Sequence, residues 1–221
     1  MKILLLLQNL KSKYMILIVV LTFAFTGLNA QYKCKYRLDK FDEFTNTNIV
    51  ATKFNSLVTK MFPLSLLNVM YYIEVCVDME YTAKDTLFYL FIRFDNNNLG
   101  REDEADCINK DNKIMFVLSN KEVITLNATK NYKGKKTDGD IVAGVVTSYK
   151  SEVACSYLIT KEALNSLMEN LVLKCRVEVL SGKEGAENKN YDFDISNNQT
   201  IISDQLNCVL QKFKPKADLY E

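Results

Sequence analysis

The chain has 221 residues with 28 basic and 27 acidic side chains, which gives a formal net charge of +1. This balance provides no basic surplus for phosphate contacts and argues against a nucleic-acid partner. The chain contains no histidine, so Ser–His–Asp and Cys–His catalysis and His-ligated metal sites are excluded.

The first thirty residues have the layout of a secretory signal peptide. Three lysines flank the start of an apolar or small-residue run, residues 15–28, and Ala30 offers a cleavage point before Gln31. The run is shorter than the ~20 residues that a membrane-spanning helix needs. We therefore predict a cleaved signal over residues 1–30, with an uncleaved anchor as the alternative. The chain would then be exported to the periplasm, the cell surface or the extracellular space.

Residues 31–212 have the size of a single domain, and residues 213–221 are predicted to form a disordered tail. Alternating apolar residues dominate the domain and predict strands. The segments with this pattern are 34–39, 49–54, 71–79, 86–94, 113–118, 122–126, 141–147, 152–159, 171–180 and 191–195. Residues 56–70 are ambiguous, because Pro63 argues against one continuous helix.

Two neighbouring segments, 71–79 and 86–94, predict an antiparallel hairpin with a short loop. A short helix is predicted after Thr160, which is suited to cap its N-terminus, and a second from about Asn198 to Lys212. This order predicts an α+β fold, a mainly antiparallel β-rich domain that is sandwich-like or has a curved sheet. It carries a short helix between two late strands and a C-terminal helix.

All six cysteines follow the predicted signal: Cys34, Cys76, Cys107, Cys155, Cys175 and Cys208. An exported chain can form disulfides, so we expect at least one, but the sequence does not choose among the many pairings. Cys107 lies in a polar, acidic loop and is the favoured bridge partner. Cys175 and Cys208 lie among apolar residues that are typical of a core. No pair has the CxxC spacing of a zinc ribbon or a redox site.

The stretch LDKFDEFTNT places Asp39, Asp42 and Glu43 beside Phe41 and Phe44. The two carboxylates of a glycosidase must lie at a set separation, whereas adjacent residues of an extended strand point to opposite faces. We therefore interpret the acids as groups that face water or cap the turn, and the two phenylalanines as anchors of the strand end. No catalytic residue is assigned.

The acidic loop DNNNLGREDEAD, residues 95–106, matches an EF-hand calcium loop only in part. Leu99 and Asp106 stand where that loop has a side-chain oxygen ligand and a glutamate, so the EF-hand is rejected. A looser calcium site stays open, with ligands from Asp95, Glu102, Asp103, Glu104 or Asp106. A solvated loop is the simpler interpretation, and no metal or cofactor is assigned.

Three further patterns have a plain structural interpretation. The basic loop KNYKGKK, residues 130–136, could grip an anionic glycan or a phosphate but suits a mobile hairpin tip. The tripeptides at 127–129 and 198–200 match the N-glycosylation sequon, which matters in a eukaryotic secretory pathway. Tyr89 and Phe91 share one strand face, and burial in the core explains them without a ligand.

The stretch LNAQ, followed by KFDEFT, a polar turn and IVATK, resembles a group of uncharacterised exported proteins of Bacteroidota-type bacteria. The stretches IMFVLSNKEVITL and YLITKEALNSLMENLVLKCRVEV are similar to the hairpin and strand–helix–strand segments of that group. The resemblance covers about residues 35–212 and implies a β-rich domain of the envelope or the extracellular space. It implies no activity and no site residues. The six cysteines and the acidic loop at 101–106 depart from it.

An export signal, a sheet-dominated pattern and the absence of a catalytic constellation together predict a non-enzymatic binding or scaffold domain. The expected partner is a protein or a glycan, and contact with the membrane is limited to the signal segment. Two alternatives stay open. One is a histidine-free, carboxylate-based hydrolase that acts on carbohydrates, and the other is a calcium-stabilised adhesion module.

Overall fold

The structure is a computed structural model of the chain. It describes residues 32–64, 67–82, 84–99, 104–138, 141–142, 145–146, 149–181 and 188–213. The predicted signal peptide and residues 214–221 of the predicted tail lie outside these segments. Contacts divide the chain into two units, residues 1–33 and 34–221, and every element below belongs to the second unit.

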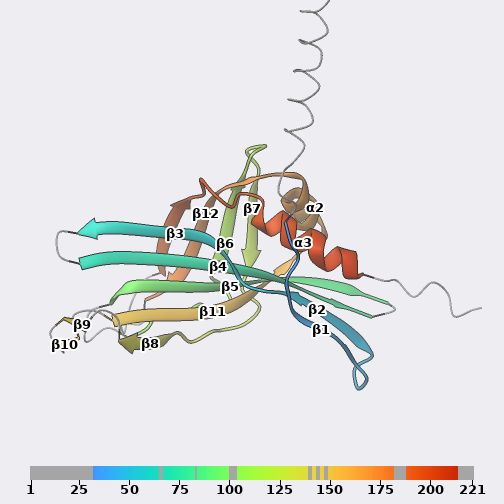
Figure 1. Ribbon diagram of the computed structural model, residues 1–221, viewed down its shortest axis with the longest axis horizontal. Helices are drawn as coiled ribbons and strands as arrows, with labels where there is room; N and C mark the ends of the chain where they lie inside the picture. The colour runs from blue at the N-terminus through green and yellow to red at the C-terminus, as the bar shows by residue number, and fades with distance from the viewer. Residues whose placement is uncertain are drawn as a thin grey trace, which may run out of the picture. The chain divides into compact units, whose positions relative to one another are not determined.

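A seven-stranded antiparallel sheet forms the larger layer of the domain (Figure 1). Its strand order is β1-β2-β4-β5-β11-β8, and β3 also pairs with β4. The strands are β1 (Tyr36–Asp42), β2 (Thr47–Thr52), β3 (Asn55–Leu64), β4 (Leu67–Tyr81), β5 (Thr86–Leu99), β8 (Lys135–Asp138) and β11 (Tyr149–Ile159). β2 pairs with residues 78–81 of β4, and β3 pairs with residues 67–75 of the same strand. Along this edge of β4, β2 and β3 therefore form one interrupted strand.

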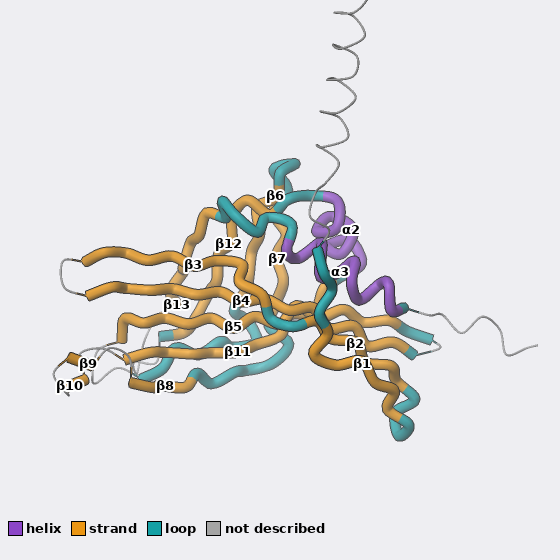
Figure 2. Tube along the Cα trace, viewed as in Figure 1, coloured by secondary structure: helices purple, strands orange, loops and turns teal. Residues whose placement is uncertain are grey.

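A four-stranded antiparallel sheet forms the second layer, with the order β13-β12-β6-β7. Its strands are β6 (Lys113–Leu118), β7 (Val123–Asn127), β12 (Val172–Leu180) and β13 (Asn188–Asp194). In Figures 1 and 2 these strands run across the direction of the large sheet. A separate two-stranded ribbon pairs β9 (Ile141–Val142) with β10 (Val145–Val146).

The core consists of the apolar residues that alternate along each strand. On β4 and β5 the opposed pairs Ile73–Phe94 and Val75–Ile92 are fully buried. Phe94 also packs against Tyr191 and Phe193 of β13, with ring centroids 5.1 and 6.4 Å apart. These aromatic contacts join the two sheets, and offset or edge-to-face pairs of this kind favour a fixed arrangement.

Two helices pack beside the sheets. In α2 (Lys161–Glu169) the Thr160 side chain accepts a hydrogen bond from the backbone N–H of Ala163 and caps the N-terminus. Helix α3 (Ile201–Lys212) packs on β2, β4 and α2. Its buried Gln205 donates from Nε2 to the carbonyls of Lys53 and Val75, at 3.1 and 3.0 Å. The helix therefore satisfies backbone groups at the interruption between β2 and β3.

The predicted β-rich α+β fold is confirmed in outline, with mainly antiparallel strands, a curled large sheet and two helices. The ambiguous residues 56–70 prove to be the β3–β4 hairpin, in which Pro63 lies on an edge strand that tolerates a missing N–H. The prediction of a single strand over 141–147 was wrong, because its described residues, 141–142 and 145–146, pair with each other as the β9–β10 ribbon. Within the described residues, no helix has the length and apolar character needed to cross a membrane.

Candidate functional site

One face of the large sheet, here called the outer face, points away from the core. Its side chains alternate with the core side chains along β4, β5 and β11, and the register aligns them in rows. It carries Tyr72, Glu74, Cys76, Asp78, Leu87, Tyr89, Phe91, Arg93, Asp95, Glu152, Ser156 and Leu158. The prediction that Tyr89 and Phe91 lie in the core was wrong, because Phe88, Leu90 and Ile92 occupy that side. The charges at Arg93 and Asp95, on the same face as Tyr89, were the signal for this orientation.

The centre of the outer face is an ion pair packed among aromatic rings. The Arg37 guanidinium of β1 reaches across β2 and donates to both carboxylate oxygens of Asp78, each at 2.7 Å. The guanidinium also lies 5.7 Å from the ring centroid of Phe91. Asp78 is 7% exposed, and this burial raises its pKa although the pairing with Arg37 pulls it the other way.

Cys76 lies beside this ion pair and is fully buried. Burial and the neighbouring carboxylate of Asp78 raise the pKa of its thiol to about 12. The thiol therefore stays protonated at neutral pH, and its Sγ lies 3.9 Å from Asp78 Oδ1, within reach of a weak hydrogen bond. A neutral thiol in this position is a packing group and a poor nucleophile.

A second charge network surrounds Arg93. Its Nη1 donates to Glu74 at 2.9 Å, and its Nε lies 3.3 Å from Glu152 Oε1. The guanidinium stacks over the Phe54 ring at 4.8 Å. Burial raises the pKa of the adjacent Asp95, and Glu152 adds to the shift. Glu74 and Glu152 therefore lie on either side of one cation, which favours their ionised forms and does not suit the general acid of a glycosidase.

A groove of about 430 Å³ opens where the outer face meets the end of β7. We call it the Leu158 groove. Its apolar side consists of Leu87, Tyr89 and Leu158, and both leucines are unusually exposed, at 37% and 42%. Leu126 and Ala128 add small apolar areas to this side. The polar residues of the lining are Lys110, Thr125, Asn127, Thr129 and Thr160. The lining contains one positive charge and no carboxylate.

Hydroxyl groups fix one rim of the Leu158 groove. The side-chain oxygens of Thr129, Tyr132 and Ser156 lie 2.6–2.7 Å from one another and form a closed triangle of hydrogen bonds. The backbone N–H of Thr129 also donates to the Ser156 carbonyl at 2.9 Å. These bonds hold the chain beyond β7 against β11, so the groove is formed before any ligand arrives. The sequon at 127–129 lies in this rim.

The outer face of the small sheet carries a different groove, of about 410 Å³. We call it the Val123 groove. Its floor is apolar, with Met115, Val117 and the 57% exposed Val123. Two cross-strand ion pairs, Lys174–Asp194 and Arg176–Asp192, line its side. Arg176 lowers the pKa of Asp192 by hydrogen bonding, so this carboxylate stays ionised.

The acids of LDKFDEFTNT occupy the β1–β2 hairpin and do not form a site. Asp42 Oδ1 accepts hydrogen bonds from the backbone N–H groups of Phe44 and Thr45, at 3.0 and 3.4 Å, which confirms the turn-capping interpretation. Asp39 pairs with Lys212 of α3 at 2.8 Å. The prediction that the phenylalanines anchor the strand end was wrong, because Phe41 is 48% and Phe44 101% exposed.

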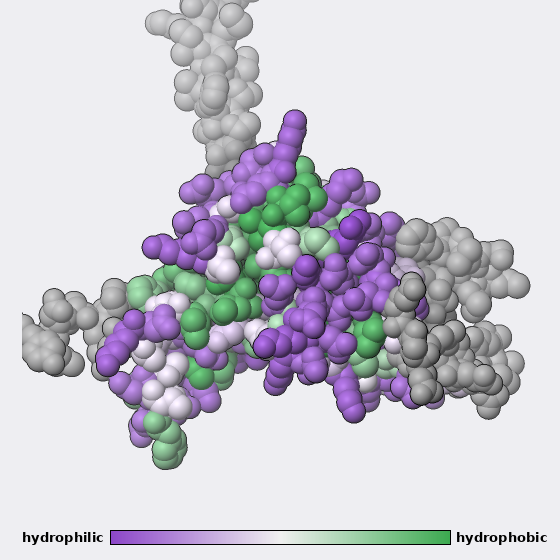
Figure 3. All heavy atoms as spheres, turned by 180° about the vertical axis from the view of Figure 1, so that it is seen from behind, coloured by the Kyte–Doolittle hydropathy of each residue, from purple (hydrophilic) through white to green (hydrophobic). Residues whose placement is uncertain are grey.

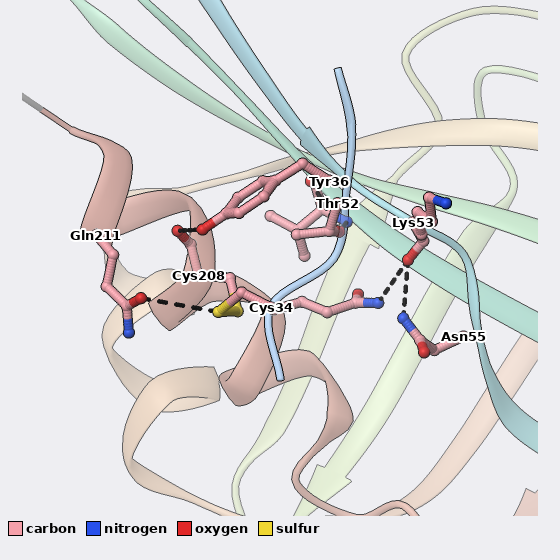
Figure 4. Close-up of a disulfide and its surroundings, with 9 residues drawn as sticks. Cys34, Tyr36, Thr52, Lys53, Asn55, Cys208 and Gln211 are labelled. Atoms are coloured by element: carbon pink, nitrogen blue, oxygen red, sulfur yellow. Dashed lines mark hydrogen bonds between the residues drawn. A yellow bond between two sulfur atoms is a disulfide. The ribbon is translucent and has the colours of Figure 1, made fainter. Parts of the chain in front are cut away.

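The expectation of a disulfide is confirmed by the bridge between Cys34 and Cys208 (Figure 4). It links the segment before β1 to α3, where the Tyr36 hydroxyl also donates to the Cys208 carbonyl at 2.9 Å. The choice of Cys107 as bridge partner was wrong, since its thiol is free and lies 3.6 Å from the Ala105 carbonyl. Cys76, Cys155 and Cys175 are buried and unbridged.

The structure separates the candidate calcium ligands. Asp95 lies on the outer face, 4.0 Å from Lys150. Asp106 lies on the opposite side of β5, where it accepts a hydrogen bond from the Asn96 amide at 3.0 Å. Glu102 and Asp103 lie outside the described residues, and Glu104 is exposed. Among the residues that the structure describes, no cluster of three or more potential metal ligands occurs.

The basic loop at 130–136 is more ordered than a hairpin tip. Tyr132 and Ile108 exchange backbone hydrogen bonds, and residues 135–138 pair with β11. A Cβ on Gly134 would lie 1.9 Å from the Asp106 carbonyl oxygen, so only glycine permits this close approach. Lys136 stacks over the Tyr149 ring at 4.4 Å. The prediction of a mobile hairpin tip over residues 130–136 was therefore wrong for residues 132–136.

Comparisons with known proteins found no match to a family model, to a curated protein or to a solved structure. The resemblance to exported Bacteroidota-type proteins thus stays a prediction.

Proposed function

We propose that this protein is a non-enzymatic binding domain, exported from the cell, that holds a short glycan segment in the Leu158 groove. One observation carries the proposal. Exposed Leu87 and Leu158 line a groove of about 430 Å³ together with Tyr89 and with residues that carry hydroxyl, amide and ammonium groups. Ligand sites typically have volumes of about 300–1,000 Å³ and combine an apolar lining with a few placed polar groups.

The chemistry of a sugar ring suits this lining. A pyranose has an apolar C–H face, which packs on leucine or tyrosine, and hydroxyl groups at its edge that need hydrogen-bond partners. Asn127, Thr125 and Thr160 supply those partners, with donors as well as acceptors. Lys110 adds the one charge of the lining, so a sugar with a carboxylate, such as a uronic acid, should bind more tightly than its neutral counterpart.

The same features favour binding over hydrolysis. A glycosidase needs two carboxyl groups on either side of the scissile bond, and the Leu158 groove contributes none. The carboxylates of the Val123 groove lie in ion pairs with Lys174 and Arg176. A group that a cation holds ionised is a poor general acid. For the calcium alternative, the opposite positions of Asp95 and Asp106 give no support.

Binding can be tested on an array of neutral and uronic-acid oligosaccharides, followed by NMR titration with the best-bound sugar. We expect the wild type to bind, with shifts in the amides of residues 87, 89 and 158. Leu158→Glu should lose binding by at least tenfold, because it places an unpaired charge on the apolar side. Val123→Glu, a matched change at an exposed residue of the small sheet, should bind as the wild type does. No binding across the array, or equal binding by Leu158→Glu, would overturn the proposal.

Export is tested separately by the intact mass of the protein made with its full N-terminus, before and after reduction and alkylation. A mature chain that begins at Gln31 and contains one bridge is the expected result. A full-length mass in which all six thiols are alkylated without prior reduction would contradict export through a cleaved signal and an oxidising compartment.

A further inference from the structure

Four lysines lie in or beside the Leu158 groove. Lys110 belongs to its lining, and Lys130, Lys133 and Lys135 follow one another in the segment that leads into β8. We call these four residues the lysine strip. We propose that the lysine strip is a subsite for an acidic polysaccharide, whose chain continues from the sugar held in the Leu158 groove. The inference rests on the proposed function of that groove, and it adds the length and the charge of the ligand.

The positive charge of the lysine strip is not compensated by ion pairs. All four side chains are exposed, and within the described part of the chain none of them forms an ion pair. The sequence contains no aspartate or glutamate over residues 123–137. The strip is therefore a local surplus of positive charge on a chain whose formal net charge is only +1. Basic clusters of this kind are typical of surfaces that bind polyanions.

Backbone hydrogen bonds hold the first part of the lysine strip in place. Ile108 and Tyr132 exchange backbone hydrogen bonds at 2.9 and 2.6 Å, and the Asn131 side chain accepts one from the N–H of Lys110 at 2.8 Å. The antiparallel register of the Ile108–Tyr132 bridge places Lys110 opposite Lys130. Because the backbone is fixed beforehand, binding has to order only the lysine side chains, which lowers its entropic cost.

The second part of the lysine strip has the pattern of a strand. Exposed and half-buried residues alternate from 131 to 136, and Lys135 begins β8, which pairs with β11. Residues two apart on a strand point to the same side and lie roughly 7 Å apart, so Lys133 and Lys135 present their charges in a row. A polysaccharide with an acidic group on successive sugars presents a matching row of anions.

The lysine strip joins the Leu158 groove at its hydroxyl rim. Lys130 directly follows Thr129 of the groove lining. Its Nζ lies 5.5 Å from the ring centroid of Tyr132, and the Tyr132 hydroxyl is hydrogen-bonded to those of Thr129 and Ser156. A sugar chain that leaves the groove on the side of Lys110 and Thr129 therefore meets Lys130 first.

Carboxylates beside the lysine strip favour a single sugar chain over a membrane. Glu152 lies opposite Lys135 in the register of β8 and β11 and is held 3.3 Å from Arg93. Asp111 directly follows Lys110 and is exposed. A flat anionic bilayer would meet these carboxylates as well as the lysines, whereas a flexible chain can follow the lysines alone. Nucleic acid is disfavoured, because the groove offers leucines and one tyrosine where single strands need several stacked aromatic rings.

Isothermal titration with oligomers of galacturonic acid at low salt tests the inference. A disaccharide probes the groove alone, and an octasaccharide also reaches the strip. The strip variant, with Lys130→Gln, Lys133→Gln and Lys135→Gln, should bind the octasaccharide about tenfold more weakly than the wild type, because each exposed charge contact contributes a small amount. Both proteins should bind the disaccharide equally. The difference should disappear at high salt, which screens exposed charges.

A control variant with the same change in net charge replaces three exposed lysines elsewhere: Lys40→Gln, Lys53→Gln and Lys121→Gln. Lys40 lies on the β1–β2 hairpin, which projects at the lower left of Figure 3, and β1 and β8 are the two ends of the strand order. The control variant should bind both sugars as the wild type does. Since all six substituted side chains are exposed, both variants should keep the melting temperature of the wild type.

The two sugars separate a failure of this inference from a failure of the proposed function. If wild type and strip variant bind the octasaccharide equally while the disaccharide still binds, the strip is no subsite and the proposed function stands. If the wild type binds neither sugar, both are overturned. If the wild type binds single-stranded DNA or phosphatidylserine vesicles as tightly as the octasaccharide, and the strip variant does not, the strip belongs to another polyanion and the inference is overturned.

Discussion

Two arginine–aspartate pairs on the two sheets each engage both carboxylate oxygens of the aspartate and differ in burial. Arg37 donates from Nη2 alone to both oxygens of Asp78, whereas Arg176 donates from Nε and Nη2 to one oxygen each of Asp192. The Asp78 side chain is 11% exposed and the Asp192 side chain 63%. Burial raises the pKa of Asp78, whereas hydrogen bonding to Arg176 lowers the pKa of Asp192. An arginine that contacts both carboxylate oxygens therefore does not by itself decide the sign of a pKa shift, because desolvation outweighs the pairing at the buried pair.

The difference in burial also separates the structural roles of the two ion pairs. The Arg37–Asp78 pair joins β1 to β4 across an intervening strand and packs on Phe91. The Arg176–Asp192 pair joins directly opposed residues of β12 and β13 in water. We expect the first to matter for stability and the second to contribute little.

The largest expected effect comes from removing the disulfide that positions β1. Cys208→Ser should lower the free energy of unfolding by about 2–5 kcal/mol, because the unfolded chain regains the entropy of a long closed loop. It should also weaken the Arg37–Asp78 pair and leave the Arg176–Asp192 pair intact. Urea denaturation measures the first effect, and NMR of the arginine side chains the second. An unchanged midpoint would show that the bridge is dispensable.

Removing the cation of the buried pair should have the next largest effect. Arg37→Ala leaves the Asp78 carboxylate buried without its ion pair, which costs about 1–3 kcal/mol at pH 7. The double variant Arg37→Met with Asp78→Leu removes both charges and should recover most of this loss. Chemical denaturation of the three proteins makes the comparison. If the double variant is as unstable as Arg37→Ala, packing and not charge explains the loss.

The pH dependence distinguishes the two pairs. Because the pKa of Asp78 is raised, this carboxyl binds a proton more tightly in the folded protein than in the unfolded chain. The contribution of Asp78 to stability therefore falls as the pH rises through the pKa of the folded state. Without Arg37 the pKa should rise further. The difference between Arg37→Ala and wild type should therefore shrink on acidification at pH values above the unfolded pKa of about 3.9. Denaturation midpoints between pH 4 and 7 test this, and a constant difference would contradict it.

The smallest effect is expected at the exposed pair. The lowered pKa of Asp192 stabilises the fold above the unfolded pKa, and this contribution is lost as the pH falls through the folded pKa. Arg176→Ala should leave the midpoint at pH 7 almost unchanged, because water screens the pair. Any small difference should persist down to about pH 4 and vanish below it. A loss as large as that of Arg37→Ala would reject the distinction between the pairs.

Local patterns in the sequence were sufficient to predict the main strands and both helices. Tyr81 and Thr86 close the predicted β4–β5 hairpin, and Thr160 caps the predicted helix. Alternating side chains define the two faces of a strand. When both faces carry apolar residues, the sequence pattern does not say which face a second layer will cover. Phe88 and Phe91 illustrate this limit, since the first is buried and the second lies on the outer face.

The candidate site depended on contacts that no local pattern encodes. Leu158 and Lys110 are 48 positions apart in the chain and line one groove, because the segment after β7 bonds both to β11 and to the residues around Lys110. The exposure of Phe44 was likewise missed, because its apolar character predicts burial and the projection of the hairpin depends on α3. Pairing of Cys34 with Cys208 spans 174 positions and also follows from the assembled fold.

The disulfide has a consequence for the order in which the chain matures. Cys34 is made early, but its partner Cys208 emerges only after β13 has been synthesised. Until then Lys212 and the Cys208 carbonyl are also missing as partners for Asp39 and Tyr36. The β1–β2 hairpin should therefore be among the last parts of the domain to settle, and during this interval the Cys34 thiol is open to exchange with the other cysteines of the chain.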